Sequence, residues 1–123
     1  MKKILIVDDD LDMHFIYKDV FVDRVDDFSL ISVFSVNEAL EVLKNQEVDL
    51  IVLDIIMEPL SGSYLYLKIK QDKSVRLKNI PVIISSVLGS KGLKHFSESK
   101  SAVIVEKPFS YDFFLKKVDE LLK

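Results

Sequence analysis

Short apolar runs recur along the chain, and stretches with helical spacing of apolar residues separate them. Runs such as residues 4–7 and 50–53 contain no alternation of polar and apolar positions. This pattern is typical of strands that are buried on both faces of a parallel sheet. We therefore expect strands at residues 3–7, 29–34, 50–53, 81–85 and 103–105.

Helix signals lie between these runs. Apolar residues at helical spacing predict helices at residues 11–22, 36–44, 63–70 and 111–122, with a weaker one at 90–98. Ser35 and Glu38 form a capping box before the second helix, and Ser110 can cap the last. Strands that alternate with helices of this length are joined by right-handed crossovers, with helices on both faces of the sheet. The sequence therefore predicts a doubly wound α/β fold.

Composition is consistent with one domain over residues 1–123, because a chain that is 49% hydrophobic and 30% charged can bury one core. The chain has no cysteine, which excludes disulfides, thiolate metal sites and cysteine nucleophiles. The apolar run after Lys2 and Lys3 is too short for a signal peptide or a membrane span. We expect a cytoplasmic protein without membrane insertion.

The net charge of −3 gives no argument for nucleic acid as a direct partner. The charge is nevertheless unevenly distributed, because residues 1–58 contain 14 acidic and 5 basic side chains, and the remainder contains 6 acidic and 12 basic. We interpret this asymmetry as solvated helix faces rather than a surface for an anionic partner.

Polar residues follow the apolar runs at the positions where strands are expected to end. Asp8, Asp9 and Asp10 follow the first run, Asp54 follows the third, and Lys107 follows the fifth. Because ligands of parallel sheets lie beyond the carboxyl ends of the strands, these side chains should converge at one edge. Carboxylates crowded together repel unless a divalent cation and an ammonium group offset them, so we expect a metal site beside a lysine.

Structural roles are alternatives for some of these residues. Asp10 is the aspartate most suited to cap the first helix, and Asp54 could cap the turn that follows it. Lys107 precedes Pro108, which holds it in an extended or turn conformation and favours a charge directed at an anion. Ser85 and Ser86 end the fourth strand, where one hydroxyl could donate to an oxyanion or bond local backbone.

The sequence resembles a two-component response regulator receiver domain over its whole length. The residues that carry the resemblance are the run 4–10, Asp54 with Met57 and Gly62, the run 81–86, and Lys107-Pro108-Phe109. The resemblance implies a flavodoxin-like (βα)5 three-layer sandwich with a parallel five-stranded sheet in the order 2-1-3-4-5. It also implies a cis peptide bond between Lys107 and Pro108.

The resemblance further implies the roles of the site residues. Asp54 is the expected phosphoacceptor and Ser86 the hydroxyl switch. Lys107 is the expected phosphoryl-binding lysine. The implied Mg²⁺ ligands are Asp8 (through water), Asp9, Asp54 and the backbone carbonyl of Ile56.

The resemblance also implies partners. The phosphoryl donor would be a sensor histidine kinase or a histidine phosphotransferase, and output would pass to a downstream target protein through the surface formed by residues 90–98 and 103–123. We expect a stand-alone signalling domain that assists its own phosphoryl transfer and hydrolysis and is not an enzyme.

Several positions differ from the family pattern. Pro59 is displaced by one residue and Glu58 adds a carboxylate beside the site, and Val87 stands where a small residue is usual. Ile104 replaces the usual aromatic switch residue. We interpret His14 and His95 as ordinary surface or half-buried histidines rather than phosphorelay sites.

Two other functions remain as alternatives. Val87 and Ile104 would suit a receiver-like binding module that works without phosphorylation. A Mg²⁺-dependent phosphohydrolase would need a second acid two residues beyond Asp54, where the chain has Ile56. Because Ile56 and Leu88 cannot orient a hydrolytic water, we expect a phosphorylated state that lasts on the order of hours.

Overall fold

The computed structural model describes residues 1–57, 60–87 and 102–122. Within these residues the chain forms one parallel sheet of five strands in the order β2-β1-β3-β4-β5. The strands are β1 (Lys2–Val7), β2 (Phe28–Val33), β3 (Leu50–Asp54), β4 (Val82–Ser86) and β5 (Ala102–Glu106). The predicted fold class and strand order are confirmed.

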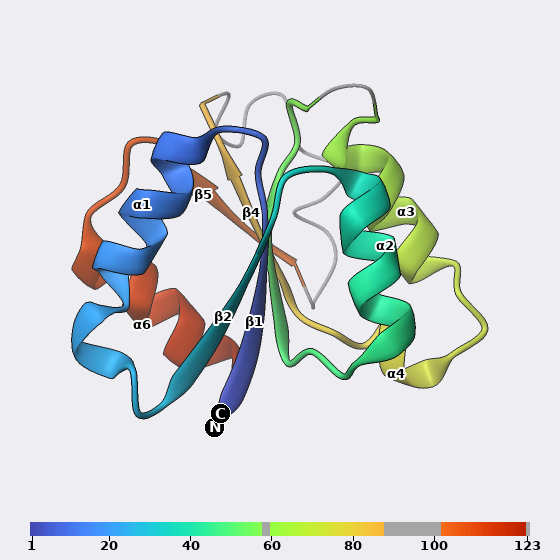
Figure 1. The fold of residues 1–123 in the computed structure, drawn as a ribbon, viewed down its shortest axis with the longest axis horizontal. Coiled ribbons are helices and arrows are strands. Elements are labelled where there is room, and N and C mark those ends of the chain that lie inside the picture. The colour runs from blue at the N-terminus through green and yellow to red at the C-terminus, as the bar shows by residue number, and fades with distance from the viewer. Residues whose placement is uncertain (58–59, 88–101, 123) are drawn as a thin grey trace.

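Helices cover both faces of the sheet (Figure 1). On one side lie α1 (Leu11–Val20) and α6 (Tyr111–Leu121), and on the other lie α2 (Val36–Asn45), α3 (Gly62–Lys70) and the short α4 (Val75–Lys78). The predicted first helix was too long, because the chain after Val20 tightens into the separate turn η1 (Val22–Arg24). The helix expected at residues 90–98 lies outside the described residues.

Alternating side chains of the buried strands fill two cores. On β1, Leu5 and Val7 belong to the cluster on the α2 and α3 side, whereas Ile4 and Ile6 belong to the cluster on the α1 and α6 side. All four are fully buried. Because β1 is buried on both faces, its sequence at residues 4–7 is a continuous apolar run.

Side-chain caps fix where the helices begin. Asp10 accepts a hydrogen bond from the Asp12 backbone N–H (2.9 Å), which confirms its expected role at the start of α1. Ser35 accepts from the Glu38 N–H, and Ser110 accepts from the Phe113 N–H, as predicted. These caps set the directions in which α1, α2 and α6 leave the loops.

The helix α6 is attached to the N-terminal half of the chain at both of its ends. At its start, the Tyr111 hydroxyl donates to Asp19 of α1 (3.2 Å). Near its end, Arg24 of η1 donates through two nitrogens to Asp119, at 2.9 and 3.2 Å. Arg24 also pairs with Asp27 and lies over the ring of Phe28, so one side chain joins η1, β2 and α6.

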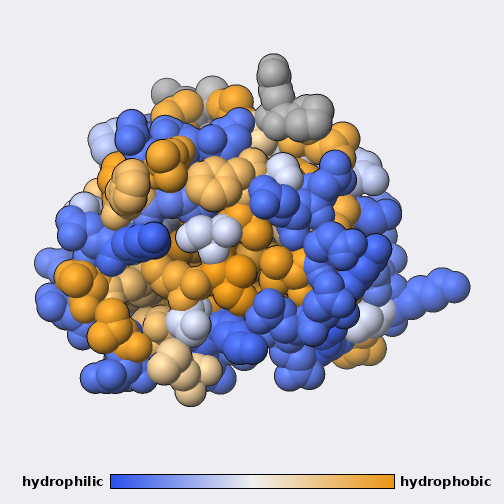
Figure 2. All heavy atoms as spheres, in the orientation of Figure 1, coloured by the Kyte–Doolittle hydropathy of each residue, from blue (hydrophilic) through white to orange (hydrophobic). Residues whose placement is uncertain are grey.

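The surface is mixed in character. Viewed with β2 toward the reader, apolar side chains gather between α1 and α2, over the edge of the sheet, and hydrophilic side chains cover the outer face of α2 (Figure 2). None of the helices in the described part of the chain combines the length and hydropathy needed to cross a membrane.

Candidate functional site

Three carboxylates meet at the carboxyl ends of β1 and β3. Asp8 and Asp9 follow β1 directly, and Asp54 is the last residue of β3. One oxygen from each side chain lies within 4.8 Å of the others, and Asp8 and Asp54 are buried while Asp9 is exposed. The sequence prediction that these residues converge is confirmed. Clustered carboxylate oxygens are the donors that a hard divalent cation such as Mg²⁺ prefers, so this donor set fits that ion.

Asp54 is held at the strand end by a local hydrogen bond. Its Oδ1 accepts from the backbone N–H of Ile56 (3.1 Å), and its Oδ2 lies 3.6 Å from the ammonium nitrogen of Lys107. Burial raises the pKa of the Asp54 carboxyl above its ordinary value, and the neighbouring Asp8 adds to this rise. The positive charge of Lys107 and the Ile56 N–H oppose the shift.

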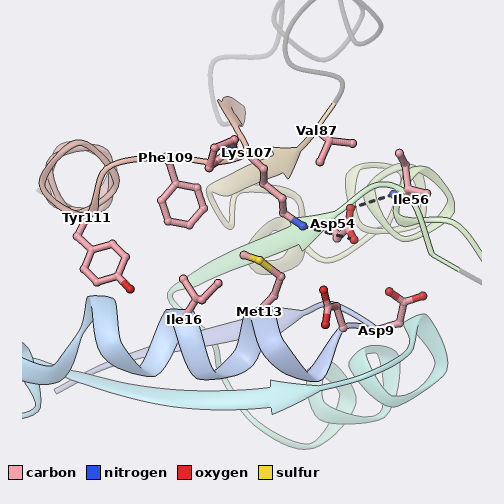
Figure 3. A pocket seen from close by; sticks show the side chains of 11 residues that line it. Asp9, Met13, Ile16, Asp54, Ile56, Val87, Lys107, Phe109 and Tyr111 are labelled. Carbon is pink, nitrogen blue, oxygen red and sulfur yellow. Dashed lines mark hydrogen bonds and ion pairs between the residues drawn. The ribbon is translucent and has the colours of Figure 1, made fainter.

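Lys107 places its ammonium group close to the carboxylates of both Asp8 and Asp54, and Figure 3 shows it reaching toward Asp54. Its Nζ lies 3.1 Å from Oδ2 of Asp8 and 3.6 Å from Oδ2 of Asp54, and its side chain is only 13% exposed. The backbone N–H of Lys107 donates to the Ser86 carbonyl (2.8 Å). The peptide bond to Pro108 is cis, as the resemblance implied.

The two hydroxyls at the end of β4 are both buried. Ser85 pairs in register with Asp54, and Ser86 pairs with Glu106 of β5. Among the described residues Ser85 Oγ has no hydrogen-bond partner. Burial raises the pKa of the nearby Tyr17 hydroxyl, and the negative charges of Asp8 and Asp54 add to this rise. Because side chains alternate along a strand, Ser85 and Ser86 leave β4 on opposite faces.

The exposure expected for His14 was wrong, because its side chain is buried (3% exposed) rather than half-buried or at the surface. Its Nε2 lies 2.7 Å from the carbonyl oxygen of Asp8, and its ring packs 4.4 Å from that of Phe34. His14 therefore fixes the backbone of a site residue. The available signal was its position one turn after the cap residue Asp10, on the helix face that meets the sheet.

A cavity of about 510 Å³ opens beside the carboxylates (Figure 3). Its polar end includes Asp9, Asp54 and Lys107. The other lining residues are Asp10, Met13, Ile16, Ile56, Val87, Pro108, Phe109 and Tyr111. The volume falls in the range of small-molecule sites in proteins.

The residues that depart from the family pattern can be placed in part. Val87 lines the cavity and is 64% exposed. Ile104 is partly buried and packs against the core on the α2 and α3 side. Glu58, Pro59, Leu88 and His95 lie outside the described residues.

The sequence model of one family, described as the response regulator receiver domain, matches residues 4–119. No curated protein sequence matches.

Several solved structures are similar. The receiver domain of Francisella response regulator 1452 is 29% identical, with a TM-score of 0.76 over 99% of this chain and 97% of that one. Response regulator protein TrrA from Thermotoga maritima, solved in complex with Mg²⁺-BeF, is 27% identical, with a TM-score of 0.78 over 99% of this chain and 100% of that one. Chemotaxis protein CheY4 of Vibrio cholerae is 20% identical and shares the fold, with a TM-score of 0.85 over 99% of both chains.

Proposed function

Because this chain belongs to the response regulator receiver domain family, we propose that it accepts a phosphoryl group on Asp54 from a phosphohistidine donor. Receiver domains are signalling domains of two-component systems. The observation that carries the proposal is the group of Asp8, Asp9 and Asp54 with the ammonium of Lys107 among them. This arrangement suits phosphoryl transfer, which depends on positioning and on charge stabilisation.

The proposed metal is Mg²⁺, held by Asp9, Asp54 and the backbone carbonyl of Ile56, with Asp8 acting through a water. When bound, this ion supplies positive charge that offsets the charge of the transferring oxygens. The Mg²⁺-BeF complex of the similar Thermotoga maritima protein supports this assignment. The donor set of Asp8, Asp9 and Asp54 supports it independently.

In the proposed reaction, Oδ2 of Asp54 attacks phosphorus because Oδ1 is engaged by the Ile56 N–H. A bond forms between Oδ2 and phosphorus, and the bond from phosphorus to the donor histidine nitrogen breaks. Lys107 then moves its ammonium from the carboxylates to a phosphoryl oxygen. The 3.6 Å separation between Lys107 Nζ and Asp54 Oδ2 makes this a short movement.

Ser86 is the proposed switch that senses the phosphoryl group. Its backbone carbonyl already binds the Lys107 N–H at 2.8 Å, so a change at one residue reaches the other directly. Such a contact biases an equilibrium between two conformations, which a target protein then reads. The proposed partners are a sensor histidine kinase or histidine phosphotransferase and a downstream target protein in the cytoplasm, without direct nucleic acid binding.

A phosphorylation-independent binding module is the second candidate. The exposed Val87 beside the site favours it, because an aliphatic side chain there can crowd a phosphodonor. The buried Lys107 paired with two carboxylates argues for the phosphoacceptor, since a simple binding surface has no need of that charge arrangement.

The test is to incubate the protein with acetyl phosphate and Mg²⁺ and to measure phosphate that hydroxylamine removes. Wild type should gain one such phosphate and Asp54→Asn none. Asp10→Asn is the matched control, because Asp10 lines the same cavity but caps α1, a role that asparagine fills equally well. Equal labelling of wild type and Asp54→Asn would exclude Asp54 as the acceptor, and no labelling of wild type would favour the binding module.

A further inference from the structure

The cavity beside Asp54 extends well beyond the polar groups that phosphoryl transfer requires. Figure 3 shows Asp9 and Asp54 on one side and Ile16, Phe109 and Tyr111 on the other. A phosphoryl group with its metal occupies only the polar end. The remainder of the 510 Å³ is bounded by an apolar wall that the proposed reaction leaves without a role.

The apolar wall is built on positions that the fold holds in place. Met13 and Ile16 lie three residues apart on α1 and therefore share one helix face. The ring of Phe109 stacks on Phe114 (4.7 Å between centroids) and on Tyr17 (5.9 Å), both of which are fully buried. An apolar group that enters this volume meets a surface that is already arranged.

The positive charge at the polar end of the cavity determines which chemical group of a bound molecule can lie there. Lys107 and a divalent cation held by the carboxylates both require an anionic group there. A molecule that fills the whole cavity therefore has an anionic head and an apolar tail. Within the proposed phosphoryl chemistry, the molecule whose head reacts at Asp54 is the phosphodonor.

We propose that this chain accepts small acyl phosphates with an aromatic or extended aliphatic acyl group in preference to acetyl phosphate. This inference rests on the proposed function of Asp54. The head of such a donor binds at Lys107 and the carboxylates, and its acyl group occupies the volume between Met13, Ile16 and Phe109. The preference comes from burial of the acyl group at a preformed apolar surface.

The transfer step balances without a further reactant. A bond forms between Asp54 Oδ2 and phosphorus, and the bond between phosphorus and the acyl oxygen breaks. The electron pair of the broken bond leaves with the carboxylate product, and no proton or redox partner is needed. In an in-line displacement the leaving group departs on the side away from Asp54, and Figure 3 shows Ile16, Phe109 and Tyr111 across the cavity from Asp54.

The experiment compares benzoyl phosphate, butyryl phosphate and acetyl phosphate as donors to the wild-type protein at fixed Mg²⁺. Each phosphorylation rate is divided by the rate at which hydroxylamine alone consumes that donor, which removes differences in intrinsic reactivity. We expect the corrected rate to rise from acetyl to butyryl to benzoyl phosphate, by roughly tenfold overall. Equal corrected rates would overturn the inference even where acetyl phosphate labels Asp54.

A pair of variants tests whether the apolar wall causes the preference for larger acyl groups. Ile16→Ala should lower the ratio of benzoyl to acetyl rates several-fold, because part of the apolar wall is lost. Phe15→Ala is the matched control, since Phe15 is the preceding residue of α1, is exposed and does not line the cavity. This control should keep the wild-type ratio. If Ile16→Ala slows transfer from a phosphohistidine protein but leaves the ratio unchanged, the wall serves a protein partner and the inference is wrong.

Failure of the proposed function gives a different result. If no donor produces hydroxylamine-sensitive phosphate on wild type, Asp54 is not an acceptor and both proposals are wrong. If acetyl phosphate produces it without any preference for larger acyl groups, only the further inference is lost. The comparison of donors uses only the wild-type protein. It can therefore disprove the inference even if Ile16→Ala does not fold.

Discussion

The Nζ atom of Lys107 lies 3.1 Å from Oδ2 of Asp8. The distance from the same Nζ to Oδ2 of Asp54 is 3.6 Å, so the lysine stabilises both acids of a crowded site. Its role before any phosphoryl group arrives is therefore to offset the mutual repulsion of two buried carboxylates.

Replacing Lys107 should consequently cost stability as well as phosphorylation. We expect Lys107→Ala to lower the free energy of unfolding by about 3 kcal/mol at neutral pH in EDTA, because two buried carboxylates lose their counter-charge. Saturating Mg²⁺ should recover part of this loss. Urea denaturation with and without Mg²⁺ measures both effects.

Lys117→Ala is the control for this change, since Lys117 pairs with Glu120 on the surface of α6. Its cost should stay below about 1 kcal/mol and should not depend on Mg²⁺. Similar losses for the two lysine variants would show that the Lys107 pairs contribute no more than surface ion pairs.

The raised pKa of Asp54 predicts how stability depends on pH. A raised pKa means that the folded state binds the proton more tightly than the unfolded state does, so stability is lost as pH rises through the folded pKa. Asp54→Asn should therefore be more stable than wild type at neutral pH in EDTA. The gain should disappear below the ordinary carboxyl pKa of 3.8.

Thermal unfolding of both proteins in EDTA across this pH range gives the measurement. Asp112→Asn, at an exposed position in the first turn of α6, should show no gain at neutral pH. A constant stability difference between Asp54→Asn and wild type from acid to neutral pH would contradict the prediction.

Gly62 is required by the close approach of α3 to the end of β3. A Cβ atom at this position would overlap the Asp54 carbonyl oxygen and lie 2.9 Å from the Asp54 carbonyl carbon and the Ile55 Cα. These are backbone atoms, so no side-chain rotation relieves the overlap. We expect Gly62→Ala to destabilise the fold by about 1–3 kcal/mol and to weaken Mg²⁺ binding, because the end of β3 must shift.

Calorimetric Mg²⁺ titration and denaturant unfolding check these two effects. Ser63→Ala, the adjacent position in α3, should change neither by much. A Gly62→Ala protein with wild-type stability and Mg²⁺ affinity would show that the backbone of β3 yields without cost.

The surroundings of Asp54 predict a slow loss of phosphate. Ile56 is 53% exposed and lines the cavity with Val87, and neither side chain can orient a water molecule for attack on an acyl phosphate. We expect a half-life on the order of hours, and a faster loss in Ile56→Gln, whose amide can hold a water. Timed measurement of residual phosphate on the purified phosphoprotein decides this, and a half-life of seconds without a phosphatase would disprove it.

Much of the fold could be predicted because the strands are buried on both faces. The apolar runs that end at Val7 and Asp54 mark their strands clearly, since no polar position interrupts them. The helix α4 was missed because its four residues are too few to show periodicity, although Ser74 caps it by accepting from the Leu77 N–H. A serine before a short apolar and basic stretch was the available signal.

The sequence was sufficient to predict which residues come together in the site, because parallel strands bring their carboxyl ends to one edge of the sheet. The pairing of Lys107 with Asp8 was not predictable, since it depends on side-chain distances that no spacing encodes. The burial of His14 could have been inferred from its position one turn after Asp10, whereas its contact with the Asp8 carbonyl depends on the rotation of α1 against the sheet. The switch role of Ser86 stays a prediction. So do the metal-binding roles of Asp8, Asp9, Asp54 and the Ile56 carbonyl.

The attachments at the two ends of α6 restrict how the molecule can respond to a signal. Sliding or rotating this helix on the sheet would break the hydroxyl contact from Tyr111 to Asp19 and the two-pronged contact from Arg24 to Asp119. Both ends of α6 are therefore attached to the N-terminal part of the chain by side-chain contacts. A displacement of α6 would therefore have to break at least one of these contacts, while the fully buried Phe114 and Val118 keep the helix packed against the sheet.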